Sequence, residues 1–237
     1  MLYLEDKIAK IVDKVSKILP KDGLMGAWEE SDRIFDGWDE DILYALTNID
    51  PDVDVCCGAS KMVIIPSFCN YVIKIPLRGQ WIENYNEEKD EYDYYYSPFE
   101  FSGYGKGDDY CEAEVCIYEK TLEENPEYSF IFPETKFYKQ INDVKYYLQE
   151  KCKQGEGFVK NLDVSKEVET TAKDIRDALD TGSLTWCIAL AERYGIELAK
   201  NITNFLEEER ICDLHCGNLG YNMAGKPVII DFSGFYY

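Results

Sequence analysis

Apolar residues near the start of the chain recur every three or four positions. They are Ile8, Ile11, Val12, Val15, Ile18 and Leu19, and Pro20 follows directly. This spacing draws one apolar stripe along a helix, and a proline ends the pattern because it cannot continue the helical hydrogen bonds. We therefore predict an amphipathic helix over residues 2–19 that packs on the body of the protein, and a shorter helix over residues 39–48.

Strand patterns follow in three short runs that are rich in β-branched residues: 53–57, 62–66 and 71–76. Gly58 and the segment 67–70 separate these runs and supply residues typical of turns. The pattern predicts an antiparallel meander of three strands.

Residues 85–110 differ from the rest of the chain in composition. They include seven tyrosines and eight acidic residues against two lysines, and they show no clear period. We interpret this stretch as a surface insertion. Two roles are compatible with it: a docking surface, because tyrosine offers contact area at low entropic cost, or a loop with no particular role.

The remaining pattern moves from strands to helices. It predicts a helix over 113–124, strands over 130–132, 136–138 and 144–149, helices over 168–179, 184–194 and 196–206, and a closing hairpin of strands 219–222 and 227–230. A β-rich half followed by a helical half favours an α+β fold with two lobes. The expected domains are a helical cap over 1–50, a β-rich lobe over 51–150 that contains the 85–110 insertion, and a helical lobe over 151–237.

Charge narrows the classes of partner. The 237 residues are 46% hydrophobic, which is typical of a globular chain, and 25 basic against 46 acidic residues give a net charge of −21. Nucleic-acid backbones and anionic membranes need clustered positive charge, so we expect neither as a partner. A nucleotide needs only one or two well-placed cations and stays compatible with this composition.

Cysteine usage and hydropathy indicate a reducing compartment. The nine cysteines are odd in number and form no Cys-x-x-Cys pair. The N-terminal segment is charged throughout, unlike a signal peptide, and no apolar run approaches the roughly 20 residues of a membrane span. We expect reduced thiols and a cytoplasmic protein.

Three oxygen-bearing side chains converge near the end of the chain. A hairpin over residues 219–230 would bring Asn218, just before its first strand, beside Asp231, just after its second. Asp213 stands at the entry to the same loop. Two carboxylates and an amide oxygen are hard donors of the kind that Mg²⁺ or Mn²⁺ prefers.

The nearby Cys212, His215 and Cys216 suggest two other chemistries that we set aside. A zinc site lacks a fourth ligand, and the spacing of these residues does not suit one. A Cys-His nucleophile pair is disfavoured because residues so close on one loop rarely present both side chains to a substrate. We expect His215 to brace the loop by hydrogen bonds.

This tail resembles the catalytic core of the protein-kinase-like superfamily. Asp-Leu-His-Cys-Gly-Asn at 213–218 and Ile-Asp-Phe-Ser-Gly at 230–234 are similar to the D-L-x-x-x-N and D-F-G motifs of protein kinases, and to the D-L-H-x-G-N and I-D-F/W motifs of aminoglycoside and choline phosphotransferases. The resemblance implies phosphoryl transfer from ATP. Asp213 would orient or deprotonate the acceptor hydroxyl, and Asn218 and Asp231 would hold the Mg²⁺ that bridges the nucleotide phosphates.

An upstream strand extends the resemblance. Tyr-Val-Ile-Lys-Ile-Pro at 71–76 is similar to the V-A-I-K strand of this superfamily. Alternation along a strand puts Val72 and Lys74 on one face, opposite the face of Tyr71, Ile73 and Ile75. The resemblance implies that Val72 contacts adenine, and that Lys74 contacts the α- and β-phosphates and pairs with a glutamate on a helix.

Two glutamates are candidates for that pair. Glu114 is our choice because Ile117, Tyr118 and Thr121 lie on its helical face. Glu112 comes second because it shares a more polar face.

Two further segments match the superfamily less closely. Gly58-Ala59-Ser60-Lys61 stands where the glycine-rich loop belongs, so Gly58, Ser60 and Lys61 are expected near the phosphates. Tyr147-Leu148-Gln149-Glu150-Lys151 resembles the hinge between the lobes, where backbone groups of Glu150 and its neighbours would bind the adenine edge.

The tail also departs from the superfamily pattern. Ile211 and Cys212 replace the His and Arg that precede the catalytic Asp in protein kinases, and Ser233 replaces the glycine of D-F-G. The sequence given ends at Tyr237, so we expect an abbreviated, bilobal protein-kinase-like fold with a truncated C-lobe.

We therefore expect an ATP- and Mg²⁺-dependent phosphotransferase that acts on a protein or a small hydroxyl compound. A protein substrate or partner would dock through the 85–110 insertion or the N-terminal helix. The alternative is a catalytically idle kinase-like binding module, or an acidic inhibitor of a partner protein.

Overall fold

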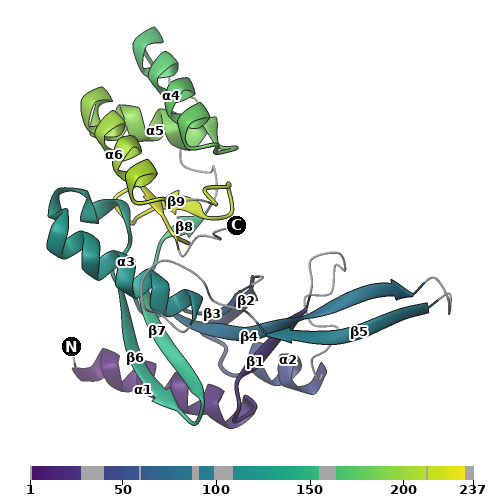
Figure 1. Cartoon of the computed structure of the whole chain (residues 1–237). Coiled ribbons are helices and arrows are strands. Elements are labelled where there is room, and N and C mark those ends of the chain that lie inside the picture. The colour runs from purple at the N-terminus through teal and green to yellow at the C-terminus, as the bar shows by residue number, and fades with distance from the viewer. Residues whose placement is uncertain are drawn as a thin grey trace. The chain divides into compact units, whose positions relative to one another are not determined.

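The chain folds as a mixed α+β protein of two compact units, each of which is described by itself (Figure 1). The computed structural model describes residues 2–27, 40–58, 60–86, 91–98, 109–154, 164–211 and 213–232. The first unit comprises Met1–Phe101, Asp108–Glu112 and Lys136–Gln149. The second comprises Ser102–Gly107, Ala113–Thr135 and Glu150–Tyr237.

A branched sheet with two helices forms the first unit. The helices are α1 (Leu2–Ile18) and α2 (Glu40–Thr47), and the strands are β1 (Leu24–Ala27), β2 (Val53–Cys57), β3 (Lys61–Pro66), β4 (Tyr71–Asn86), β5 (Glu91–Pro98), β6 (Thr135–Ile141) and β7 (Val144–Glu150). The strand order is β2-β3-β4-β7-β6, and β1 and β5 also pair with β4. β2, β3 and β4 pair antiparallel in succession, so the predicted meander is confirmed.

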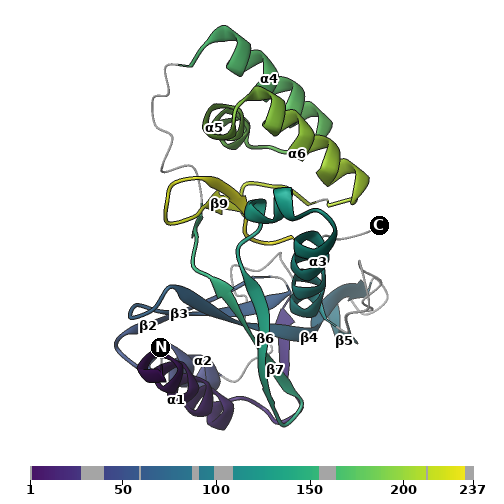
Figure 2. The same ribbon diagram turned by 90° about the vertical axis from the view of Figure 1, so that its left-hand side faces the viewer.

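The core of this unit lies between α1 and one face of the sheet. Ile8, Ile11, Val12 and Val15 of the helix, and Leu19 just after it, are buried with Met62, Ile64, Ile73 and Ile75 of the strands. Figures 1 and 2 show α1 and α2 on the same side of the sheet. The predicted first helix is confirmed, and its apolar stripe is what buries it.

Most of the described part of the predicted 85–110 insertion is strand rather than loop. β4 runs ten residues beyond the predicted strand and pairs antiparallel with β5, from Gly79 opposite Pro98 to Asn86 opposite Glu91. A two-stranded ribbon with tyrosine and acidic residues on its strands gives no simple apolar–polar alternation, which explains why the pattern escaped the sequence analysis. Residues 87–90 and 99–108 of the predicted insertion lie outside the described residues.

The second unit combines helices with a small sheet. Its helices are most of α3 (Tyr110–Glu124), the 3₁₀ helix η1 (Pro126–Ile131), α4 (Lys166–Ala178), α5 (Leu184–Tyr194) and α6 (Ile196–Glu208). Strands β8 (Lys153–Gln154), β9 (Leu219–Tyr221) and β10 (Pro227–Ile229) pair in the order β10-β9-β8. The strand predicted over 130–132 is wrong, because Pro126 begins a 3₁₀ turn there and the Ser129 hydroxyl donates to its carbonyl.

Buried aromatic side chains hold the closing hairpin against the helices. Trp186 of α5 is 2% exposed, and its Nε1 donates to the carbonyl of Val228 at 3.3 Å. Phe232 is fully buried, with its ring centroid 4.5 Å from that of Phe132. Ser165 and Ser183 cap the N-termini of α4 and α5 through their side chains. The hairpin is therefore fixed to the core of its own unit.

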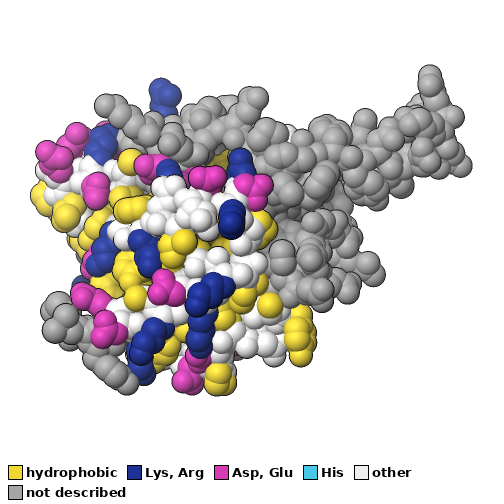
Figure 3. All heavy atoms as spheres, turned by 90° about the horizontal axis from the view of Figure 1, so that it is seen from below, with side chains coloured by type: hydrophobic (Ala, Val, Ile, Leu, Met, Phe, Trp, Pro, Cys, Tyr) yellow, Lys and Arg dark blue, Asp and Glu magenta, His cyan; other side chains and the backbone are white. Residues whose placement is uncertain are grey.

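Among the described helices, none has both the length and the apolar character needed to span a membrane. Figure 3 shows one face from below, where basic, acidic and apolar side chains are intermixed. Opposite charges also pair within the first unit. The ammonium of Lys14 lies 2.7 Å from a carboxylate oxygen of Asp50, and the ammonium of Lys139 lies 3.0 Å from one of Asp13.

Candidate functional site

The closing hairpin brings residues 218 and 231 together. β9 and β10 pair antiparallel, with Leu219 opposite Ile229, so the chain enters and leaves the hairpin at the same end. The carbonyl of Asn218 accepts hydrogen bonds from the backbone N–H groups of Ile230, at 2.8 Å, and Asp231, at 3.3 Å. The hairpin pattern predicted this adjacency, and the backbone geometry shows it.

The side chain of Asn218 also forms hydrogen bonds to Asp213. Its side-chain nitrogen Nδ2 donates to the backbone carbonyl of Asp213 at 2.7 Å and to the carboxylate oxygen Oδ2 at 3.1 Å. Asp213 has φ +62°, in the left-handed region that aspartate tolerates better than most residues. Asn218 is 8% exposed. One buried residue therefore holds the Asp213 loop through its side-chain amide and the chain after β10 through its backbone carbonyl.

His215 braces the same loop, as the sequence predicted. Its Nδ1 accepts a hydrogen bond from the backbone N–H of Gly217 at 2.9 Å, so the ring proton of neutral His215 lies on Nε2. That Nε2 is 3.8 Å from Oδ1 of Asp213. The two oxygens of the Asp213 carboxylate are thus faced by different residues, Oδ2 by Asn218 and Oδ1 by His215.

Two supporting residues were not identified from the sequence. Gln154 of β8 donates from Nε2 to the carbonyl of Gly217 at 2.6 Å. Thr181, which is buried, donates from its hydroxyl to the carbonyl of Leu214. Both are polar residues remote in sequence from the loop, and no local pattern marks them.

The donors available for a metal are oxygens. Among the described residues, no three His, Cys, Asp or Glu side chains gather as a metal-binding group. Asn218 and Asp231 would supply one amide oxygen and one carboxylate, a set that suits Mg²⁺, which usually keeps waters and phosphate oxygens as its other ligands. Cys212, one of the residues considered for zinc, lies outside the described range, and Cys216 is an exposed free thiol.

Two buried lysines share one face of the sheet in the first unit. Lys74 stands opposite Val63, and Lys61 stands opposite Pro76, so both lie on the face turned away from the core of Ile73 and Ile75. Lys74 is 4% exposed and Lys61 is 3% exposed. The predicted alternation is confirmed, and Val72, 9% exposed, lies on the face of Lys74.

The charge of Lys74 acts on a cysteine of the same sheet face. Cys56 stands opposite Val63 on β2, next to the Val63–Lys74 pair. Desolvation and the neighbouring Asp54 raise the pKa of the Cys56 thiol, whereas the Lys74 ammonium lowers it. The ammonium therefore lies within electrostatic reach of this thiol.

The predicted phosphate loop is a turn between β2 and β3. The N–H of Gly58 donates to the carbonyl of Lys61 at 2.9 Å, which closes the turn. Ser60 is buried, and its carbonyl accepts from the N–H of Leu77 at 2.9 Å. Ala59 lies outside the described residues.

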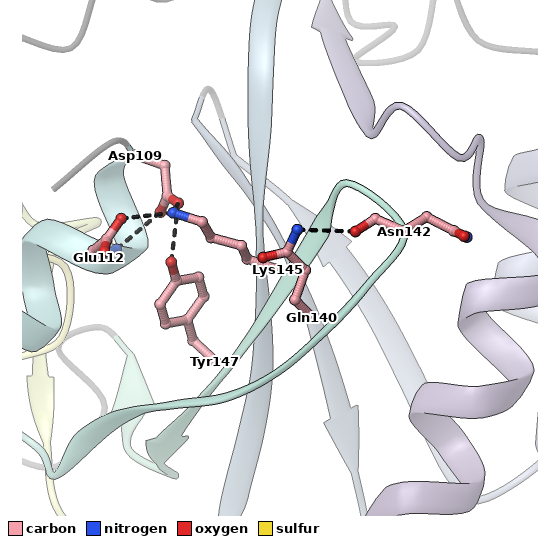
Figure 4. A network of polar contacts seen from close by, with 6 residues as sticks. All are labelled: Asp109, Glu112, Gln140, Asn142, Lys145 and Tyr147. Carbon is pink, nitrogen blue, oxygen red and sulfur yellow. Dashed lines mark hydrogen bonds and ion pairs between the residues drawn. The ribbon is translucent and has the colours of Figure 1, made fainter.

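The two candidate glutamates differ in their surroundings. Glu114 on α3 is fully buried, whereas Glu112 is ion-paired with Lys145, its Oε2 lying 2.7 Å from the ammonium (Figure 4). Asp109 also approaches Lys145, at 3.5 Å, and accepts a hydrogen bond from the hydroxyl of Tyr147 at 2.9 Å. Glu112 therefore belongs to a network that fixes the first turn of α3 to β7.

The predicted hinge residue Glu150 is the last residue of β7. Its N–H donates to the carbonyl of Glu134 at 2.8 Å, and its carbonyl accepts from the thiol of Cys152 at 3.6 Å. An adenine contact in this segment would therefore fall to the Glu150 carbonyl or to the backbone groups that follow it.

The predicted site residues form two groups. Asp213, Asn218 and Asp231 gather in the second unit, and Lys61, Val72 and Lys74 share a sheet face of the first. Glu114 and Glu150 belong to the second unit by the division of the chain. No protein-family model matches this sequence, and no curated protein is similar enough to match it.

Proposed function

We propose that this protein is an ATP- and Mg²⁺-dependent phosphotransferase with a bilobal, protein-kinase-like fold, acting on the hydroxyl group of a protein or a small molecule. The observation that supports this most is the double hydrogen bond from Asn218 to Asp213, made by a residue whose carbonyl also receives the N–H of Asp231. Three residues of the motif are thereby held in contact by direct hydrogen bonds.

Asp213 would serve as the group that orients the acceptor hydroxyl. Its carboxylate is half-buried and is held from one side by the amide of Asn218. A fixed carboxylate can accept the hydroxyl proton in a defined direction, which lowers the entropic cost of aligning the attacking oxygen.

Asn218 and Asp231 would hold the metal. Because Nδ2 of Asn218 donates to Asp213, the amide oxygen Oδ1 is the atom of that side chain available to a cation. Bound Mg·ATP would supply the phosphoryl group and the charge that the divalent ion neutralises. The protein contributes the placement of its oxygens rather than the chemistry of the transfer.

Lys74 and Lys61 would bind the phosphates. The chain has a net charge of −21, yet two positively charged ammonium groups are buried on one face of the sheet. An ammonium group binds phosphate oxygens through charge-assisted hydrogen bonds, and Lys74 stands on the strand that resembles the V-A-I-K strand.

The test is transfer of radiolabelled phosphate from ATP to the protein itself or to a panel of protein and small-molecule hydroxyl acceptors. We expect label in the wild-type chain and a loss of at least about a hundredfold in Asp213→Ala and Asp231→Ala, the range typical of removing a positioned acid–base or metal-binding group. Asn142→Ala is the matched control, because Asn142 also has positive φ, at +53°, and belongs to the first unit, whereas the motif belongs to the second.

Label that persists in both variants would remove the proposed mechanism. Absence of transfer in the wild-type chain, together with a Mg²⁺-dependent thermal shift by ATP, would instead support the idle binding module.

A further inference from the structure

The imidazole ring of His215 is exposed and yet held in place. Its side chain is 58% exposed, and exposed side chains ordinarily change rotamer freely. Here Nδ1 accepts a hydrogen bond from the N–H of Gly217 at 2.9 Å. Gly217 has no Cβ, which would lie 2.6 Å from Cε1 of the ring, and Gln154 binds its carbonyl at 2.6 Å. The backbone at residue 217 therefore fixes the orientation of the ring.

This orientation directs an N–H group toward the side of Asp213. Because Nδ1 is the acceptor, Nε2 carries the proton of the neutral ring, and it is 3.8 Å from Oδ1 of Asp213. That distance is too long for a direct hydrogen bond and is one at which a bridging oxygen is expected. An oxygen about 2.8 Å from both atoms would accept from Nε2 and donate to Oδ1. A hydroxyl group does both.

The carboxylate of Asp213 is also held from its other side. Oδ2 accepts a hydrogen bond from the side-chain amide of Asn218 at 3.1 Å, so Oδ1 is the oxygen that faces His215. The side chain of Asp213 is 29% exposed. Two fixed polar groups, one donor and one acceptor, therefore stand at hydroxyl-bridging distance in a part of the loop that solvent reaches.

We propose that His215 is a catalytic residue that donates a hydrogen bond from Nε2 to the acceptor hydroxyl, while Asp213 accepts the proton of that hydroxyl. This role rests on the proposed phosphotransferase function. The hydroxyl oxygen forms a bond to the γ-phosphorus, the bond from that phosphorus to the bridging oxygen breaks with its electron pair going to ADP, and the proton passes to Asp213. An alcohol oxygen has two lone pairs, so the one that His215 does not bind is aimed at the phosphorus.

Two substitutions separate this contact from support of the loop. His215→Asn keeps an oxygen where Nδ1 lies, which can accept the N–H two residues on, but its amide nitrogen falls short of the position of Nε2. His215→Gln places its amide nitrogen near the position of Nε2 and loses the acceptor at the position of Nδ1. If the donor is what matters, Gln replaces His215 better than Asn does. If only the loop matters, the order is reversed.

The assay follows radiolabelled phosphate from ATP to the panel of acceptors and to water, as free phosphate. We expect His215→Asn to lower kcat by at least about tenfold with an unchanged KM for ATP, and His215→Gln to lower it by less than about threefold. Thermal denaturation should give the opposite order, with His215→Asn nearer to the wild type. Cys216→Ser, at the exposed neighbouring residue, is the control and should change neither constant.

NMR spectroscopy tests the geometry without any activity. His215 is the only histidine in the sequence, so the ring signals of ¹⁵N-histidine-labelled protein belong to it. We expect the tautomer with the proton on Nε2 in the neutral ring, and the other tautomer would overturn the proposal.

The kinetic outcomes separate this role from the function on which it rests. A wild-type chain that transfers phosphate, with His215→Asn at least as active as His215→Gln, would limit His215 to bracing the loop and overturn this role alone. A rise in KM for ATP without a fall in kcat would place the N–H on the nucleotide and also overturn it. Absence of transfer to any acceptor or to water by the wild-type chain would remove the phosphotransferase function itself, and this role with it.

Discussion

The side-chain amide of Asn218 donates to both the backbone carbonyl and the carboxylate of Asp213, at 2.7 Å and 3.1 Å. The amide can do this because nitrogen Nδ2 carries two hydrogens, whereas an aspartate side chain of the same shape would present only oxygens. This contact lets a conservative substitution test the loop independently of any activity.

We predict that Asn218→Asp is less stable than the wild type and that its deficit grows as pH rises. The new carboxylate would face the carbonyl and carboxylate oxygens of Asp213, so its folded-state pKa would be raised. At low pH the new carboxyl group is protonated and can lie beside these oxygens. As pH rises through its folded-state pKa it becomes ionised, and the stability of the variant falls. Thermal denaturation at mildly acidic and neutral pH measures this, with Asn218→Ala as the control. A deficit that is independent of pH would contradict the assigned contact.

Gly217 is predicted to tolerate no side chain while His215 is present. A Cβ at position 217 would lie 2.6 Å from Cε1 and 2.9 Å from Nδ1 of His215, nearer than carbon atoms approach in proteins. Gly217→Ala should therefore displace the ring and break the hydrogen bond from the residue 217 N–H to Nδ1.

A double-mutant cycle with His215→Ala measures that conflict. If the steric contact is the cause, the double variant should be more stable than the sum of the two single changes predicts, by about 0.5–3 kcal/mol. Urea denaturation of the wild type and the three variants gives the four free energies of unfolding, and strict additivity would show that the ring is not what excludes the side chain.

Periodicity predicted those elements that bury one face. The apolar stripe of α1 and the apolar residues that alternate along 71–76 pack in one shared core, and the sequence predicted both. The distal half of β4 and the whole of β5 were missed because tyrosine and acidic residues on the two strands of a ribbon leave no simple apolar–polar alternation. β1 was missed as well, since Leu24–Ala27 is too short to show a period.

The candidate site divides in the same way. Asn218 and Asp231 could be placed together from the hairpin pattern, because antiparallel pairing follows from local sequence. Gln154 and Thr181 could not, because their hydrogen bonds to the carbonyls of Gly217 and Leu214 depend on tertiary packing. The preference for Glu114 over Glu112 followed from helix faces and stays a prediction.

Two adjacent tyrosines of β7 should respond differently to loss of their hydroxyl groups. Tyr147 donates to Asp109 at 2.9 Å, whereas the buried hydroxyl of Tyr146 has no hydrogen-bond partner among the described residues. We expect Tyr147→Phe to destabilise the fold by about 1–3 kcal/mol, and Tyr146→Phe to be neutral or stabilising by up to about 1 kcal/mol. Chemical denaturation of both variants checks this. Equal destabilisation would mean that Tyr146 has a partner.

Tyr146 should also contribute to the loss of stability in alkali. Desolvation, with a smaller contribution from Asp13, raises its pKa from 10.0 to about 12. Ionisation is thus easier in the unfolded chain, so the contribution to stability is complete below pH 10 and is lost as pH rises toward 12. Tyr146→Phe should flatten the fall of the unfolding free energy over this range, while Tyr44→Phe, at a residue that is 72% exposed, serves as the control. Parallel curves for both variants would contradict the shift.

Lys74 should control the reactivity of Cys56. The two residues share a sheet face, and the ammonium lowers the pKa of the thiol against the larger effect of desolvation. Lys74→Met removes that positive charge, so the thiol pKa should rise and its alkylation by iodoacetamide at mildly alkaline pH should slow, because the thiolate is the reactive form. Peptide mass spectrometry reads the rate at Cys56 and, within the same sample, at the exposed Cys216 as an internal reference. Lys10→Met on the exposed side of α1 is the matched substitution and should leave the Cys56 rate unchanged. An unchanged alkylation rate in Lys74→Met would show that the ammonium lies away from this face. It would also contradict the phosphate-binding role proposed for Lys74.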